Sequence, residues 1–377
     1  MNRYAMIRSH FFVHSKELPF FFKPNTILGK NCFDLEILRM RTELIHPTRP
    51  VRYLRPQKEW NEIIAIYLYL AGMGAGSYVI GTLLNWFVQP SRVLLIWGLS
   101  LDFAKAAILW GPILVAIGAP FLILDLGIKR RFLYACLNPR TSWVARGFLI
   151  LSIFIVFGLV LLAKSVLLFN WPYAGSTFWT IADILTMAFA FATALYTGIL
   201  LKATKSIPLW NTHLLPLLFL VSALSTGSMA IILSILGTGL LSNDSEALKV
   251  LMRGEQIFVA IEAIVLYLFL SRRYRAAEQG KDSVRLLLFG RMKLIFWGGI
   301  VLLGFVFPMI LESIASFSHG NVTLIFTAGL LLLCGGFFLR LGILHAGIKD
   351  RLPMVRLMEI QYELAKNPKS EILIPKE

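Results

Sequence analysis

Residues 60–81 read WNEIIAIYLYLAGMGAGSYVIG, and this stretch decides the fold. After Glu62 it carries no charged side chain, and about 20 apolar residues in a helix are long enough to cross the hydrocarbon core of a bilayer. Three glycines, Gly72, Gly74 and Gly76, crowd one face of that helix. Small residues at such spacing let another helix approach closely. The stretch therefore predicts a membrane-spanning helix that packs tightly against its neighbours.

The whole chain has the composition of a membrane protein. Of its 377 residues 57% are apolar and 15% are charged, whereas soluble domains have about 45–50% and about 25%. A water-soluble globule is therefore excluded. The net charge of +16 fits membrane topology, so we expect no nucleic-acid partner. The cysteines Cys32, Cys136 and Cys334 are far apart, so we expect neither an iron–sulfur cluster nor a zinc site in this chain.

Apolar runs long enough to span a bilayer recur along the chain. We predict an all-α polytopic membrane protein with eight transmembrane helices, arranged as two four-helix bundles. The fifth run is too long for one straight span, and Gly237 and Gly239 indicate that its last turns leave the hydrocarbon. The predicted spans lie near residues 61–86, 104–128, 143–169, 176–201, 209–241, 254–271, 294–315 and 322–348.

The basic residues orient these spans. Both terminal regions and the connections on their side carry thirty of the 37 Lys and Arg residues, whereas the alternate connections carry three. Because cytoplasmic loops concentrate Lys and Arg, both termini are predicted to be cytoplasmic, with the protein in the cell inner membrane. The alternation requires an even number of spans, which supports eight. A basic surface that docks a partner or anionic lipid is the alternative explanation, and it would allow the inverted orientation.

The chain divides into three regions. Residues 1–60 form a basic arm with scattered aromatic residues, which suits an interfacial or partner-docking role and is too short and irregular for an enzyme domain. Residues 61–348 form the eight-span membrane domain. Residues 349–377 form a cytoplasmic tail, in which the apolar spacing over 352–366 predicts an amphipathic surface helix.

Three sequence motifs are weak signals singly, but together and in this order they are specific for one protein family. The first span is rich in glycine, residues 122–147 read LILDLGIKRRFLYACLNPRTSWVARG, and residues 196–228 read YTGILLKATKSIPLWNTHLLPLLFLVSALSTGS. Over residues 60–348 this series resembles the NrfD/PsrC-like family, the membrane subunits of polysulfide reductase and related complex iron–sulfur molybdoenzymes. The chain departs from the family at Ile128 and Lys129, where the family usually has Arg-Pro.

The resemblance implies a function that hydropathy cannot supply. It implies a haem-free membrane subunit that reacts with a quinone, either menaquinone or ubiquinone. It also implies electron exchange with a ferredoxin-like iron–sulfur partner of four clusters, which serves a catalytic subunit that often carries molybdopterin. Whether the chain is itself an enzyme is left open, because it would be a non-catalytic or quinone-site subunit of an oxidoreductase complex.

A quinone headgroup needs hydrogen-bonding groups for two carbonyl oxygens and a route for protons, so polar side chains in the spans are candidates. Glu62 and Tyr69 are two helical turns apart on one face. The resemblance adds Tyr67, because family pocket residues stand shortly before the glycines. For Glu62 the alternative is a carboxylate that stabilises the helix start, and for Tyr69 an aromatic anchor at the membrane interface. For Asp125 the alternative is a structural role in the loop. The quinone-binding candidates are Glu62, Tyr67, Tyr69, Asp125, Tyr196 and His213.

A second group of ionisable residues lies deeper, where an isolated charge costs about 2.5–3.5 kcal/mol and should find a partner. Asp102 and Lys105 are spaced to neutralise each other on one helix. Glu262 has no local partner, and Arg340 is its natural counter-ion. We interpret Glu262 as a proton relay, and the alternative is a static ion pair that fixes helix packing. The proton-transfer candidates are Asp102, Lys105, Asp183, Glu262 and Arg340, with Lys164 and Glu312 in the same group of residues.

Three other classes of protein compete with this function. A di-haem cytochrome b subunit needs four membrane histidines, and only His213 and His345 lie in the predicted spans. A secondary transporter also fits eight spans with buried charges and Gly-interrupted helices, but it should act without iron–sulfur and catalytic chains. A purely structural anchor is the third class, and its deep carboxylates should be dispensable.

Overall fold

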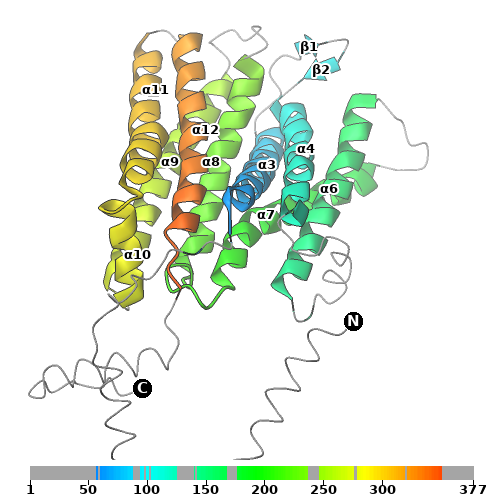
Figure 1. Ribbon diagram of the computed structural model, residues 1–377. Helices are drawn as coiled ribbons and strands as arrows, with labels where there is room; N and C mark the ends of the chain where they lie inside the picture. The colour runs from blue at the N-terminus through cyan, green and yellow to red at the C-terminus, as the bar shows by residue number, and fades with distance from the viewer. Residues whose placement is uncertain are drawn as a thin grey trace, which may run out of the picture. The chain divides into compact units, whose positions relative to one another are not determined.

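Long helices account for most of the residues that the computed structural model describes (Figure 1). The described residues are 57, 60–87, 94–96, 99–101, 103–124, 140, 142–167, 176–236, 246–275, 278–318 and 321–349. All of them belong to one unit of the chain, Leu54–Asp350. In chain order the elements are α3 (Glu62–Phe87), β1 (Leu94–Ile96), β2 (Leu99–Leu101), α4 (Phe103–Leu124), α6 (Trp143–Leu167), α7 (Ser176–Lys202), α8 (Leu214–Leu236), α9 (Glu246–Arg275), α10 (Glu278–Leu288), the π-helix η2 (Ile295–Val306), α11 (Phe307–Phe317) and α12 (Val322–His345).

The helical membrane fold predicted from the sequence is confirmed. Among the described residues, α4 contributes a shorter apolar helix over Ala107–Leu122, at the place of the second predicted span, and it contains Pro112 and Pro120. The count of eight spans and the division into two bundles stay predictions. Seven described segments are long and apolar enough to cross a membrane: Glu62–Phe87, Trp143–Lys164, Thr177–Lys202, Leu214–Leu236, Leu248–Arg275, Ile295–Phe317 and Val322–His345.

The boundaries differ from the prediction in several places. The fifth predicted span begins at residue 209, whereas α8 begins at Leu214, because the preceding residues form turns in which the Trp210 N–H donates to the Ile207 carbonyl oxygen at 3.1 Å. The stretch between the predicted spans 254–271 and 294–315 contains α10, a helix that the sequence did not predict. A short antiparallel hairpin of β1 and β2 lies between α3 and α4. The arm (except Gln57 and Trp60), the tail (except Lys349) and Gly237 and Gly239 lie outside the described residues.

Helix α3 makes its most extensive contacts, among the described elements, with α4, α7, α8 and α12. Nearly every side chain from Ile64 to Thr82 is buried, so α3 presents almost no surface to lipid in this stretch. The glycines make these contacts close: a Cβ on Gly76 would collide with the α8 backbone at Ala223, and a Cβ on Gly74 would lie 2.6 Å from a carbonyl oxygen of α4. The prediction that the Gly-rich face of the first span packs tightly is therefore confirmed.

A second close contact joins η2 to α12. A Cβ on Gly335 would collide with the backbone of Gly304, so only glycine fits at this crossing. The η2 segment is a π-helix, a form that is rare and often occurs at functional sites. Pro308 follows it at the start of α11 and has no N–H to donate to the preceding turn, which interrupts the regular helical ladder there.

Gly335→Ala should destabilise the protein, because its Cβ has no room against η2. Overpacking of this kind typically costs about 1–3 kcal/mol. Gly298→Ala, on η2 itself, is the matched control because a Cβ there meets no atom within 4 Å. Thermal unfolding of both variants in detergent measures the difference. Equal melting temperatures would contradict the close contact.

Candidate functional site

Arg340 on α12 is fully buried and lies at the centre of the site. Its Nη1 donates hydrogen bonds of 2.8 Å to Ser222 Oγ on α8 and to the carbonyl oxygen of Gly336. The guanidinium carbon lies 5.4 Å from the centroid of the Tyr69 ring on α3, within the range of a cation–π contact. Arg340 Nε and Nη2 have no hydrogen-bond partner among the described residues. The guanidinium therefore has donors to spare.

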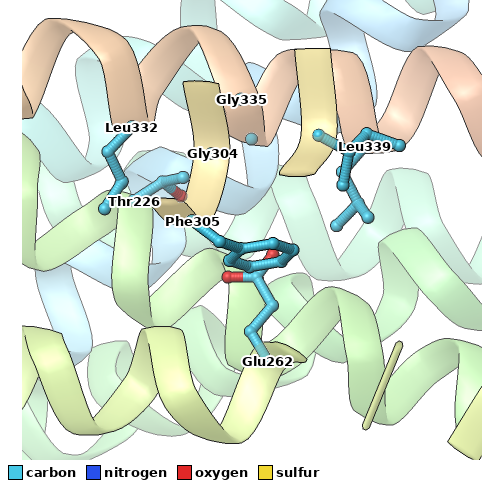
Figure 2. Close-up of a pocket in the computed structure, with 9 residues that line it drawn as sticks. Thr226, Glu262, Gly304, Phe305, Leu332, Gly335 and Leu339 are labelled. Carbon is cyan, nitrogen blue, oxygen red and sulfur yellow. The ribbon is translucent and has the colours of Figure 1, made fainter. Parts of the chain in front are cut away.

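Glu262 on α9 is buried close to this arginine. Its carboxyl group lies within electrostatic reach of the Arg340 guanidinium and close to the Ser222 hydroxyl, which accepts from Arg340. Glu262 also lines a small cavity with Thr226 and Phe305 (Figure 2). The cavity volume is about 10 Å³, close to the minimum that one water molecule needs. The structure thus brings together the acid and the base that the sequence analysis paired.

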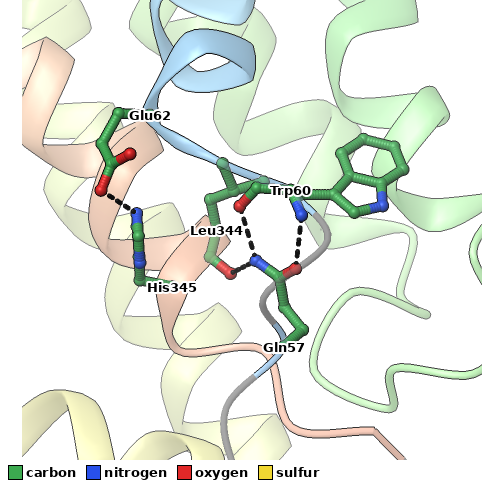
Figure 3. A network of polar contacts seen from close by, with 5 residues as sticks. All are labelled: Gln57, Trp60, Glu62, Leu344 and His345. Atoms are coloured by element: carbon green, nitrogen blue, oxygen red, sulfur yellow. Dashed lines mark hydrogen bonds and ion pairs between the residues drawn. The ribbon is translucent and has the colours of Figure 1, made fainter. Parts of the chain in front are cut away.

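Polar contacts tie the start of α3 to the end of α12 (Figure 3). The Gln57 side-chain amide donates to the carbonyl oxygens of Trp60 at 2.9 Å and Leu344 at 3.2 Å, and its Oε1 accepts from the Trp60 N–H at 2.7 Å. Beside them, Glu62 Oε1 lies 3.6 Å from His345 Nε2. The Glu62 side chain is 67% exposed and that of His345 is 24% exposed, so this end of the site is open.

The two tyrosines of the first span point to different neighbours. Tyr69 faces α12, where it contacts Arg340 and packs edge-to-face on Phe337 at 5.8 Å between ring centroids. Glu62 also faces α12, as its spacing of two turns from Tyr69 predicts. Tyr67 is fully buried beside Tyr196 of α7, and its hydroxyl has no hydrogen-bond partner among the described residues.

The remaining sequence candidates lie elsewhere. His213 precedes α8, and its Nδ1 accepts from the ammonium group of Lys202 at 2.8 Å. Asp183 on α7 interacts with Lys164 of α6 and with Tyr78 of α3, whereas Glu262 lies near Ser222 of α8 and Arg340 of α12. Asp102, Asp125 and the side chain of Lys105 lie outside the described residues.

The sequence analysis missed Glu255, which lies two turns before Glu262 on α9. Glu255 is 1% exposed and its carboxyl group interacts with that of Glu312 on α11, which is also 1% exposed. The sixth predicted span begins at residue 254 and puts Glu255 at its edge, whereas α9 begins at Glu246 and encloses it. The spacing of seven residues from Glu262 was the available signal.

Comparisons with known proteins match the chain to one family. The family model described as "Polysulphide reductase, NrfD" matches residues 52–349. One chain of the polysulfide reductase of Wolinella succinogenes is 28% identical over 76% of this chain and 94% of its own length. Protein NrfD of Escherichia coli is 28% identical over 76% of this chain and 94% of its own. One subunit of the selenate reductase of Mesobacillus selenatarsenatis is 25% identical over 75% of this chain and 72% of its own.

Ser222→Ala should destabilise the protein because it deprives a buried Arg340 N–H of its acceptor on α8. Leaving a buried donor partly unsatisfied costs about 1–3 kcal/mol. The control is Ser313→Ala on α11, whose exposed hydroxyl donates within its own helix and whose loss should stay within about 0.5 kcal/mol. Chemical unfolding in detergent micelles compares the two, and a Ser222 effect no larger than that of the control would argue against the contact.

Proposed function

The chain belongs to the NrfD family, and from that premise we propose that it is the quinone-reactive membrane subunit of an oxidoreductase complex. It exchanges electrons between the quinone pool and an iron–sulfur partner, with proton transfer through its own side chains. The observation that carries this function is the buried Arg340, two of whose nitrogen atoms, Nε and Nη2, have no hydrogen-bond partner among the described residues, beside Glu262 and Tyr69. Ionisable groups inside membrane spans are costly and are retained for function.

The partners in this proposal are a ferredoxin-like iron–sulfur subunit of four clusters and a catalytic subunit, which carries molybdopterin in many such complexes. Two of the relatives are each named as one component of a reductase, which supports a complex of several chains. The wide spacing of the three cysteines supports iron–sulfur centres in the partner. The basic residues support a location in the cell inner membrane, with both termini in the cytoplasm.

The quinone, menaquinone or ubiquinone, binds in this proposal at the open end of the site. The cavity beside Glu262 has room for about one water molecule, so a quinone ring does not fit there. At the junction of α3 and α12, Glu62 and His345 are accessible and can hold and release protons at a headgroup oxygen. When bound, the quinone supplies transfer of two electrons coupled to two protons.

Proton transfer between that end and the interior depends on the groups around Arg340. Ser222 accepts a hydrogen bond from Arg340 and lies close to Glu262, so in this proposal its hydroxyl donates to the carboxylate. The guanidinium stabilises the ionised carboxylate, and the small cavity lets a water molecule bring or remove the proton. The alternative is a static ion pair that only fixes helix packing.

Co-purification tests the function. The tagged chain, isolated from its native membranes in mild detergent, should bring with it a polypeptide that shows iron–sulfur absorption and a larger catalytic chain. A quinone analogue should bind to this complex and inhibit its quinol-linked activity. A secondary transporter would be isolated without an iron–sulfur or catalytic subunit and would not bind the quinone analogue. That result would refute the proposal.

Glu262→Gln in the intact complex should lower quinol-linked turnover by about 10²-fold, the lower end of what a positioned proton-transfer group contributes. Asp282→Asn on α10, away from the site, is the control and should leave turnover unchanged. Turnover with an artificial electron donor that reduces the partner subunits directly should be preserved in both variants. If the Glu262 variant showed the turnover and proton uptake of the wild type, Glu262 would have no role in proton transfer and only a structural role would remain.

A further inference from the structure

Two carboxyl groups meet inside the protein, two helical turns from Glu262. Glu255 on α9 and Glu312 on α11 are each 1% exposed, and their carboxyl groups lie close enough to act on each other electrostatically. Gln256, the next residue of α9, also interacts with Glu312. The proton transfer described for Arg340 and Ser222 does not use either of these acids.

A buried hydroxyl lies beside the two acids. Ser225 on α8 is 1% exposed, and its hydroxyl lies close to the Glu255 carboxyl group. Among the described residues, neither this hydroxyl nor either carboxyl oxygen of Glu255 has a hydrogen-bond partner, and one oxygen of Glu312 is also unpaired. Buried polar atoms are nearly always paired in native proteins. Four unpaired oxygen atoms at one place therefore point to a ligand that donates hydrogen bonds.

The negative charges around Glu255 and Glu312 favour a proton as that ligand. Two adjacent carboxylates in an apolar interior repel each other, and the other charged group that acts on Glu255 is a third acid, Glu262. One proton between the first two carboxyl groups removes the repulsion and supplies a hydrogen bond. We propose that Glu255 and Glu312 form a second proton-binding site, which shares one proton at rest and takes up a second.

The second proton can pass from this pair to Glu262. The O–H bond on Glu255 breaks and a new O–H bond forms on the Glu262 carboxylate through a chain of water molecules, because Glu262 is two helical turns away on α9 and neither Glu255 nor Glu312 lines the cavity beside it. The pair then keeps one proton and one negative charge, while Glu262 becomes neutral. This inference concerns proton binding alone and does not rest on the reaction with a quinone.

Infrared spectroscopy of the purified full-length chain, without quinone or partner, tests the site. A protonated carboxylic acid has a carbonyl stretch that is separate from carboxylate bands and shifts in deuterated water. At neutral pH in potassium buffer the wild type should show such a band, and Glu255→Gln/Glu312→Gln should lose it. Each single variant should shift its frequency, because the shared hydrogen bond is replaced. Asp282→Asn and Glu262→Gln are controls that should retain the band of the pair.

Two outcomes would overturn the proposal. If the double variant keeps the wild-type band unchanged, Glu255 and Glu312 carry no proton. If the wild-type band disappears when sodium replaces potassium, the pair binds a metal cation and not a proton. Where the double variant does not fold, as judged by size-exclusion chromatography, the single variants decide, and unchanged frequencies in both would overturn the site.

Discussion

The constraint on which the rest of the structure depends is a full positive charge in the interior of a membrane protein. The Arg340 guanidinium donates to the Ser222 hydroxyl and to a backbone carbonyl of its own helix, and it lies over the face of Tyr69 with the Glu262 carboxyl group nearby. These groups come from α12, α8, α3 and α9. Four helices must therefore keep their relative positions for the charge to remain tolerable, since an uncompensated buried charge is strongly destabilising.

Glycine gives the helices the close approach that this arrangement needs. A Cβ on Gly72 would lie 3.1 Å from Arg340 Nη2, and one on Gly336 would lie 2.5 Å from the Thr226 side chain. The small residues of the first and last spans thus leave room for the guanidinium as well as for backbone contact. The polar groups and the glycines depend on each other, because a larger side chain at Gly72 or Gly336 would displace the Arg340 guanidinium from its partners.

Much of the fold could be predicted from the sequence, and less of the site. Apolar run length and glycine spacing predicted the helices, ordered motifs predicted the family, and helical periodicity placed Glu62 and Tyr69 on one face. Spacing along one helix does not say which other helix lies opposite. The contact between Tyr67 and Tyr196, and that between Glu255 and Glu312, join distant segments and depend on tertiary packing.

Hydrogen bonds from Gln57 join the segment before α3 to the end of α12. The Gln57 N–H donates to the Gly347 carbonyl oxygen at 2.9 Å, while its side chain holds the Leu344 carbonyl. The start of α3 and the end of α12 are therefore fastened together, so a displacement of either helix would change the distance between Glu62 and His345, which lie beside this junction.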